Sequence, residues 1–140
     1  MELQVGVKVL LKNPEGKFLV IRRATDRYQE VLHKWDIPGG RIDKGTTLME
    51  NLNRELMEET GLSLSEAPLL AAAQDLMANK LTNNHVVRLT YIGKSSGEPR
   101  LSTEHTEYRW ITFRELRELE NLDQYLKQLI RDGIISEAIL

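Results

Sequence analysis

Residues 40–62 read GRIDKGTTLMENLNRELMEETGL, and the second half of this stretch has the spacing of an amphipathic helix. At about 100° per residue, its apolar side chains fall on one stripe, which predicts that this side faces the core. Thr47, followed three residues later by Glu50, predicts a capping box at the start of the helix. Gly61 stands where a left-handed residue ends a helix. We therefore expect a helix from Thr47 to Thr60.

Three glutamates lie near the end of this predicted helix, where electrostatics disfavours them. Glu55, Glu58 and Glu59 are spaced i, i+3 and i+4, so they share one edge of the helix. Like charges at these spacings repel, and the partial negative charge of the helix C-terminus adds to the repulsion. A hard divalent cation such as Mg²⁺ would remove both penalties. On the helix alone, a solvated acidic face explains the same residues, because glutamate is a good helix former.

The wider spacing of this stretch resembles the Nudix box, the signature of the Nudix hydrolase family. That signature has a glycine, a glutamate six residues later, and then the pattern Arg-Glu-aliphatic-x-Glu-Glu-x-Gly-aliphatic. The chain matches eight of the nine fixed positions and departs at Thr46, where the family has its first glutamate. In the family this glutamate helps to hold the box arginine, here Arg54, so the departure concerns the rigidity of the loop-to-helix junction. The matching residues are Gly40, Arg54, Glu55, Leu56, Glu58, Glu59, Gly61 and Leu62.

The resemblance implies hydrolysis of a nucleoside diphosphate linked to another group, with water attacking one phosphorus of the pyrophosphate. Carried over by position, Glu55, Glu58 and Glu59 would bind Mg²⁺, with Mn²⁺ as an alternative, and the carbonyl of Gly39 would add an oxygen ligand. Cations that bridge phosphate oxygens offset the negative charge that repels a nucleophile. The run Ile21-Arg-Arg-Ala-Thr-Asp resembles the MutT-like branch, which acts on nucleoside triphosphates.

The remaining catalytic and substrate-binding roles are assigned by position in the same way. Arg54 belongs to the catalytic set as the box arginine, and Glu104 resembles the loop glutamate that some family members use as a base. Glu58 is the alternative base, and a solvated loop acid is the other explanation of Glu104. Members of the family often place a basic residue at the end of the second strand to meet substrate phosphate, and guanidinium suits that role. The candidates are Arg23, Arg22 and, beside the box, Arg41, with charged strand ends as the alternative.

The histidines and tryptophans are expected to have structural rather than catalytic roles. The histidines His33, His85 and His105 lack the spacing of metal ligands, so we expect them at the surface or in loops. We expect Trp35 and Trp110 in the core rather than as platforms for a base.

Composition is that of an ordinary globular protein. The chain has 140 residues and no cysteine, and the absence of cysteine excludes disulfides and thiolate metal sites. Its formal charge of −2 gives no broad attraction to nucleic acid or membrane. The first strand is interrupted by polar residues and lacks a basic leader, so we expect neither a signal peptide nor a membrane span, and a cytoplasmic location by default. A homodimer is compatible with the sequence.

Alternating and continuous apolar runs predict strands at residues 3–11, 17–23, 35–37, 68–77, 85–93 and 108–111, and a C-terminal amphipathic helix at about 122–130. Strands interleaved with two substantial helices imply an α/β fold whose sheet is covered on both faces. The resemblance makes this the Nudix α/β/α sandwich with a mixed β-sheet between helices, as a single domain over residues 1–140.

Two other classes of function stay open beside hydrolysis. A Nudix-fold module that binds a nucleotide without hydrolysing it would explain the altered box position at Thr46. A structural domain with a decorative acidic helix is the third interpretation, and the box match argues against it.

Overall fold

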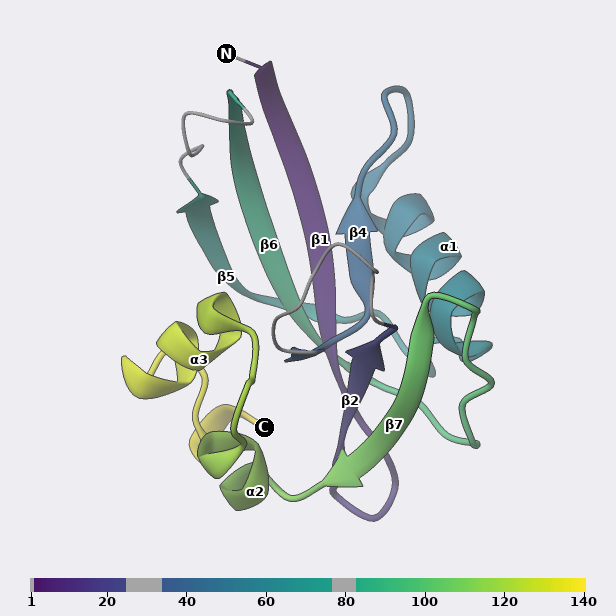
Figure 1. The fold of residues 1–140 in the computed structure, drawn as a ribbon, viewed down its shortest axis with the longest axis vertical. Helices are drawn as coiled ribbons and strands as arrows, with labels where there is room; N and C mark the ends of the chain where they lie inside the picture. The colour runs from purple at the N-terminus through teal and green to yellow at the C-terminus, as the bar shows by residue number, and fades with distance from the viewer. Residues whose placement is uncertain (1, 25–33, 77–82) are drawn as a thin grey trace.

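The computed structural model describes residues 2–24, 34–76 and 83–140. In this part of the chain, seven strands form one mixed sheet, and helices cover both of its faces (Figure 1). The strands are β1 (Glu2–Lys12), β2 (Phe18–Arg23), β3 (Trp35–Asp36), β4 (Gly39–Arg41), β5 (Leu69–Leu76), β6 (Asn84–Lys94) and β7 (His105–Ile111). The helices are α1 (Leu48–Thr60), α2 (Phe113–Glu118), α3 (Gln124–Arg131) and the short 3-10 helix η1 (Glu137–Ile139).

Two apolar layers hold the sandwich together. One layer joins the sheet to α2 and α3 through residues such as Leu10, Trp35 and Leu126, and the other joins it to α1 through residues such as Val9 and Leu56. Alternate residues of β1 enter opposite layers, as the period of a strand requires. These layers confirm the expected α/β/α sandwich, and Trp35, only 4% exposed, is confirmed in the core.

The sheet divides along β1. The strand order is β3-β2-β1-β6-β5, with β1 parallel to β6, but β1 pairs with β2 through a single register position at Lys12 and Phe18. Further along, β1 pairs instead with β4, from Gly6 to Lys8, while β2 turns away to pair with β3 and β7. Figure 1 shows β2 and β7 splayed from the rest of the sheet. This division brings β4 and the C-terminal half of α1 next to the C-terminal end of β2 and the first residue of β7.

Helix α1 begins and ends where the sequence predicts. The Thr47 hydroxyl accepts a hydrogen bond from the Glu50 amide at 3.1 Å, and the Glu50 carboxylate accepts one from the Thr47 amide at 3.3 Å. Gly61 has a φ of 70° and donates its N–H to the Met57 carbonyl at 2.9 Å. The local capping signals therefore fixed both boundaries.

Three elements differ from the predictions. Strand β7 begins at His105 rather than at 108, because pairing with β2 extends across a bulge to Arg23. Helix α2 was not predicted, although Thr112 and Glu115 form a second capping box. Strand β4 was also missed, because two of its three residues are glycines and its pairing with β1 is remote in sequence. Among the helices of the described residues, none is both long and apolar enough to span a membrane.

Candidate active site

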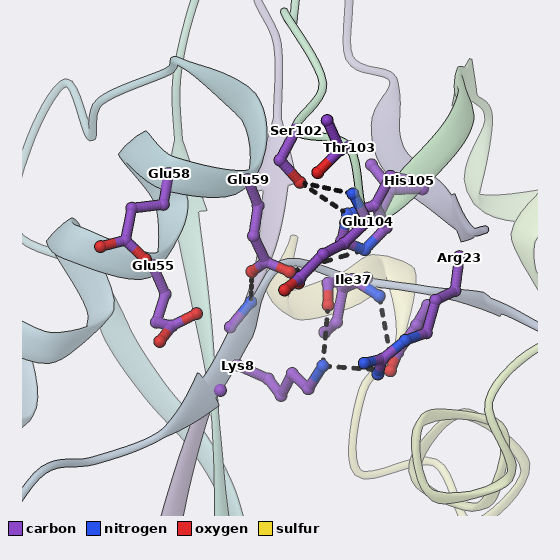
Figure 2. A pocket seen from close by; sticks show the side chains of 14 residues that line it. Lys8, Arg23, Ile37, Glu55, Glu58, Glu59, Ser102, Thr103, Glu104 and His105 are labelled. Carbon is purple, nitrogen blue, oxygen red and sulfur yellow. Dashed lines mark hydrogen bonds and ion pairs between the residues drawn. The ribbon is translucent and has the colours of Figure 1, made fainter. Parts of the chain in front are cut away.

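A polar cleft of about 440 Å³ opens where the sheet divides (Figure 2). Its walls come from β1, the end of β2, the β3–β4 segment, α1 and the loop before β7. Figure 2 shows the glutamates of α1 on one side and two cationic side chains, Lys8 and Arg23, on another. The residues lining the cleft are Lys8, Ile21, Arg23, Asp36, Ile37, Gly39, Gly40, Glu55, Glu58, Glu59, Ser102, Thr103, Glu104 and His105.

The three glutamates of α1 all reach this cleft but in different environments. Glu59 is buried, and its Oε1 accepts the N–H of Gly39 at 2.8 Å. Glu55 packs against Gly40, where an added Cβ would lie 2.9 Å from the Glu55 carboxyl carbon. Glu58 is more exposed and faces Arg54, with its Oε1 3.3 Å from Nη1. The predicted edge of the helix is therefore the acidic wall of the cleft.

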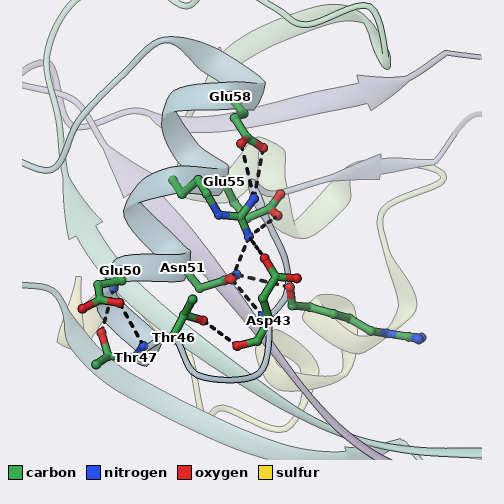
Figure 3. Close-up of polar contacts among 9 residues, drawn as sticks. Asp43, Thr46, Thr47, Glu50, Asn51, Glu55 and Glu58 are labelled. Atoms are coloured by element: carbon green, nitrogen blue, oxygen red, sulfur yellow. Dashed lines mark hydrogen bonds and ion pairs between the residues drawn. The ribbon is translucent and has the colours of Figure 1, made fainter.

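Four side chains contact the guanidinium of Arg54, and Figure 3 labels them as Asp43, Asn51, Glu55 and Glu58. Its Nη2 donates to the Asp43 carboxylate at 2.9 Å and to the Asn51 carbonyl oxygen at 2.8 Å. Glu55 and Glu58 contact the same guanidinium at 3.4 Å and 3.3 Å. The expected loss of rigidity from the missing box glutamate is thus offset by Asp43, a loop carboxylate that sequence reasoning did not single out.

Thr46 stabilises the turn that presents Asp43. Its hydroxyl donates to the Asp43 carbonyl at 2.7 Å, and its amide donates to the same oxygen at 3.1 Å. The Asp43 amide in turn donates to the Asn51 side chain at 3.1 Å. The position that departs from the box pattern therefore supports the carboxylate that meets Arg54.

The loop before β7 is bound to the C-terminal end of α1. The amide of Arg100 donates to the Thr60 carbonyl at 2.8 Å, and the amide of Ser102 donates to the Glu59 carbonyl at 3.2 Å. On its other side, the Glu104 carbonyl accepts the N–H of Ala24 at 2.7 Å. The first two bonds satisfy carbonyl groups that the end of α1 leaves free. Together, the three bonds hold the loop where Glu104 lines the cleft.

Burial makes the acidic wall costly to ionise without a cation. Burial raises the pKa of Glu59 to about 7, although the Gly39 N–H and the charge of Lys8 act in the opposite direction. The pKa of Glu55 is also raised by burial, with Arg54 opposing the shift and Glu58 adding to it. These carboxylates therefore lack enough positive charge among their protein neighbours.

The donor set fits a hard divalent cation. Carboxylate oxygens are the protein ligands that Mg²⁺ prefers, and the raised pKa values of Glu55 and Glu59 mark negative charge that a cation would compensate. As the side chains lie here, the described residues contain no group of three or more histidine, aspartate or glutamate side chains arranged to hold one ion. Glu58 is turned to Arg54, so a cation bound by all three glutamates competes with Arg54 for Glu58.

The three basic candidates are placed differently. Arg23 lines the cleft, as expected. Arg22 does not: its Nη1 donates to Glu107 at 2.8 Å, and its guanidinium lies 5.4 Å from the centre of the Trp35 ring. Arg41 also lies outside the lining, where its guanidinium donates to the side chain of Gln4. Alternation along β2 explains why two neighbouring arginines point to opposite sides.

His105 is not the surface or loop residue that we expected. It begins β7, its side chain is only 8% exposed, and it lines the cleft. Burial lowers its pKa, and the charge of Arg23 adds to this effect. His85 is partly exposed and bonds Asp75 at 2.8 Å. His33 lies outside the described residues.

Sequence reasoning also missed a partly buried set of charges, two of which, Lys8 and Asp36, line the cleft. Lys8 donates to the Asp36 carboxylate at 3.0 Å and to the Ile37 carbonyl at 3.2 Å. Arg88 lies 3.6 Å from Asp36 and 2.9 Å from Asp123, the N-cap of α3. Lys8 falls at a polar position of the alternation along β1, so the pattern of that strand gave no sign of these contacts, whereas Arg88 in β6 is a buried charge between apolar neighbours.

Comparison with known proteins identifies the family of this chain. The NUDIX domain family model matches residues 2–133. The chain is 30% identical over 105 residues to a rat protein named bis(5'-nucleosyl)-tetraphosphatase (asymmetrical), covering 73% of this chain and 71% of that protein. It is 32% identical over 95 residues to a putative 8-oxo-dGTP diphosphatase 2 of Mycobacterium tuberculosis, covering 67% of this chain and 64% of that protein.

Solved structures give the same answer for the fold. A MutT protein from Methanosarcina mazei Go1 superposes with a TM-score of 0.79 at 28% identity, covering 94% of this chain and 92% of that one. A MutT NUDIX hydrolase from Burkholderia pseudomallei has a TM-score of 0.76 at 24% identity, over 94% and 98% of the two chains. The chain belongs to the NUDIX domain family and is a Nudix hydrolase.

Proposed function

We propose that this protein hydrolyses the pyrophosphate linkage of a nucleoside diphosphate derivative with Mg²⁺ as cofactor, and that a nucleoside triphosphate is its leading substrate class. The observation that carries the proposal is one cleft with three glutamates of α1 on one wall and cations on another. A pyrophosphate needs positive charge on both of its phosphates. Mg²⁺ on the acidic wall and the side chains of Lys8 and Arg23 would supply it.

The metal ligands in this proposal are Glu55, Glu58, Glu59 and the carbonyl of Gly39. Mg²⁺ held by these ligands would offset charge on the phosphate oxygens and would lower the pKa of bound water. Arg54 acts through its contacts with Glu55 and Glu58, which it holds at 3.4 Å and 3.3 Å, so it is a positioning residue.

Glu104 is the proposed base, with Glu58 as the alternative. The oxygen of the attacking water bonds to phosphorus, its proton passes to the carboxylate, and the bond from phosphorus to the bridging oxygen breaks. Glu104 suits this role because its backbone is held at both ends, by Ala24 at 2.7 Å and by the Ser102 hydroxyl at 3.3 Å. Glu58 already accepts hydrogen bonds from Arg54 on both carboxylate oxygens, at 3.3 Å and 3.4 Å, which makes it the second choice for the base.

Names of relatives guide the choice of substrates. They specify a dinucleoside tetraphosphate, an oxidised deoxynucleoside triphosphate and, for a Psychrobacter relative, RNA pyrophosphate. All carry a nucleotide polyphosphate. The sequence run at Arg22 and Arg23 resembles the branch that acts on triphosphates, so we place these first.

A substrate panel tests the proposal. Purified protein is incubated with Mg²⁺ and ATP, dGTP, 8-oxo-dGTP, diadenosine tetraphosphate or ADP-ribose, and phosphate, pyrophosphate and nucleotide products are measured. We expect turnover that requires the cation and falls by about 100-fold or more in Glu58→Gln, which keeps its fold. Nucleotide binding without turnover would instead support a binding module. Turnover in folded Glu58→Gln equal to that of the wild type would contradict the metal assignment.

Glu104→Gln separates the two candidate bases. Loss of the base lowers kcat and removes the acidic limb of the pH profile without changing the Mg²⁺ concentration needed for half-maximal rate. Loss of a metal ligand raises that concentration. If Glu104→Gln keeps the acidic limb, Glu58 takes the role of the base.

A further inference from the structure

The imidazole of His105 lies against the most buried glutamate of the acidic wall. Its Nε2 is 3.5 Å from Oε2 of Glu59, and both side chains are largely buried, at 8% and 11% exposure. In its ionised form, which metal binding requires, the Glu59 carboxylate offers only acceptors, so the ring nitrogen that faces it then carries the hydrogen. His105 therefore presents an N–H to Glu59.

Ser102 fixes the other side of the ring. Its hydroxyl is 3.5 Å from Nδ1 of His105. In a neutral imidazole with the hydrogen on Nε2, Nδ1 is an acceptor, and the hydroxyl of Ser102 can donate to it. The three side chains thus form a series in which Ser102 orients His105 and His105 faces Glu59 (Figure 2).

The backbone holds this series in place through the same glutamate. The amide of Ser102 donates to the carbonyl of Glu59 at 3.2 Å, and the amide of His105 donates to the carbonyl of Ser102 at 3.2 Å. The loop from Ser102 to His105 is therefore bound to the backbone of Glu59, the residue whose side chain His105 contacts. The remaining carboxylate oxygen of Glu59 is fixed independently by the N–H of Gly39 at 2.8 Å.

Two fixed contacts define the plane of the Glu59 carboxylate. An ionised carboxylate has about four lone-pair sites, so one contact on each oxygen leaves further sites for a cation. Outer contacts of this kind orient metal ligands, and their loss commonly costs about 10- to 100-fold in metal affinity or activity. On this basis, which relies on the metal-binding role of Glu59 in the proposed function, we propose that His105 is a positioning residue for Glu59 and that Ser102 sets its orientation.

The test measures cation binding directly. Calorimetric titration with Mn²⁺ and Mg²⁺, without substrate, gives Kd for the wild type and for His105→Phe, which keeps the ring volume and removes the N–H. We expect Kd to rise about 10- to 100-fold in His105→Phe. His105→Gln, whose amide nitrogen can reach the position of Nε2, should stay within about threefold of the wild type, and Ser102→Ala should fall between them.

Two controls separate this proposal from the function on which it rests. His85→Phe removes a histidine that pairs with Asp75 on the far strands and should leave Kd unchanged. Glu59→Gln should abolish or strongly weaken binding. If Glu59→Gln weakens binding while folded His105→Phe binds like the wild type, the positioning role is overturned and the metal site stands. If Glu59→Gln itself binds like the wild type, both assignments are overturned.

His105→Gln keeps the proposal testable if His105→Phe does not fold. A Gln variant that binds the cation like the wild type, together with weaker binding in Ser102→Ala, supports the role of a donor at this position. A folded Gln variant that loses affinity as much as Glu59→Gln would show that the position serves another purpose.

Discussion

Glu59 makes the stability of the cation-free protein depend on pH. Its pKa rises from 4.5 to about 7 on folding because the carboxylate is buried. Between these values the folded state binds more protons at Glu59 than the unfolded state, so the free energy of unfolding falls as pH rises. A shift of this size corresponds to at most about 3 kcal/mol across the window.

We expect Glu59→Gln to remove this pH dependence. His105 acts with the opposite sign, because its pKa is lowered by burial and its contribution is lost as pH falls through 6.5 and below. The informative quantity is therefore the difference between the wild type and Glu59→Gln. Denaturant unfolding in EDTA from about pH 5 to about pH 8 should show the wild type losing stability relative to the variant. A constant difference over this range would mean that Glu59 is not a costly buried charge.

Asp43 compensates for the glutamate that the box lacks at Thr46. Because the Asp43–Arg54 pair is partly exposed, with side-chain exposures of 69% and 39%, it contributes little to stability. Its main effect is on the placement of Arg54 behind Glu55 and Glu58. We therefore expect Asp43→Ala to unfold almost like the wild type but to lower turnover roughly threefold to tenfold.

Thr46→Glu checks this compensation by a double substitution. Alone, it should leave turnover within a few-fold, because Arg54 already has Asp43 as a partner. In the Asp43→Ala background, a glutamate in the same turn should recover most of the lost turnover. Steady-state kinetics of the four proteins decide the matter, and a double variant no better than Asp43→Ala would show that position 46 does not reach Arg54. A silent wild type that gains about 100-fold in Thr46→Glu would show that this position is not merely structural.

At the scale of elements, β4 places two glycines for different reasons. Gly39 has a φ of 143°, and an added Cβ would lie 2.0 Å from the carbonyl oxygen of Val7. At Gly40, the three atoms nearest to such a Cβ all belong to the Glu55 carboxylate, the nearest at 2.9 Å. The first glycine permits the pairing of β4 with β1, and the second leaves space for a proposed metal ligand.

Gly39→Ala and Gly40→Ala should therefore fail differently. The first should cost about 3 kcal/mol or more, because the clash is with backbone and the conformation is strained. The second should fold with a small loss, since a flexible side chain can move, but its displaced Glu55 should weaken Mg²⁺ activation. Thermal unfolding and the Mg²⁺ dependence of turnover separate the two. Equal unfolding of both variants would show that Glu55 cannot move away.

Local signals made α1 predictable, and remote pairings hid the rest of the cleft. The capping box at Thr47 and the left-handed Gly61 act within one turn of the helix, so sequence alone located them. Lys8 and His105 reach the cleft because β1 pairs with β4 and because the loop before β7 binds the end of α1. No periodicity in either segment reports such a contact. The register of β2 was needed to tell that Arg23 faces the cleft and that Arg22 does not.

At the scale of the whole molecule, the cleft joins five parts of the chain, so a cation bound there should stabilise the fold. A ligand that binds only the folded state adds about 2.7 kcal/mol at a hundredfold excess over Kd. For a chain of 140 residues this corresponds to a rise in Tm of roughly 10 °C. The rise should saturate with Mg²⁺ concentration and disappear in EDTA.

The same titration links the metal to the buried charge. If Glu59 is a ligand as proposed, Mg²⁺ binding requires it to be ionised, so the cation should raise Tm more at about pH 8 than at about pH 5. Glu55→Gln/Glu59→Gln removes two of the proposed ligands, and it should show neither the saturable shift nor its pH dependence. Differential scanning calorimetry of both proteins across Mg²⁺ and pH provides the measurement. An equal shift in the double variant would place the ion away from the acidic wall, and an equal shift at both pH values would separate ion binding from the proton on Glu59.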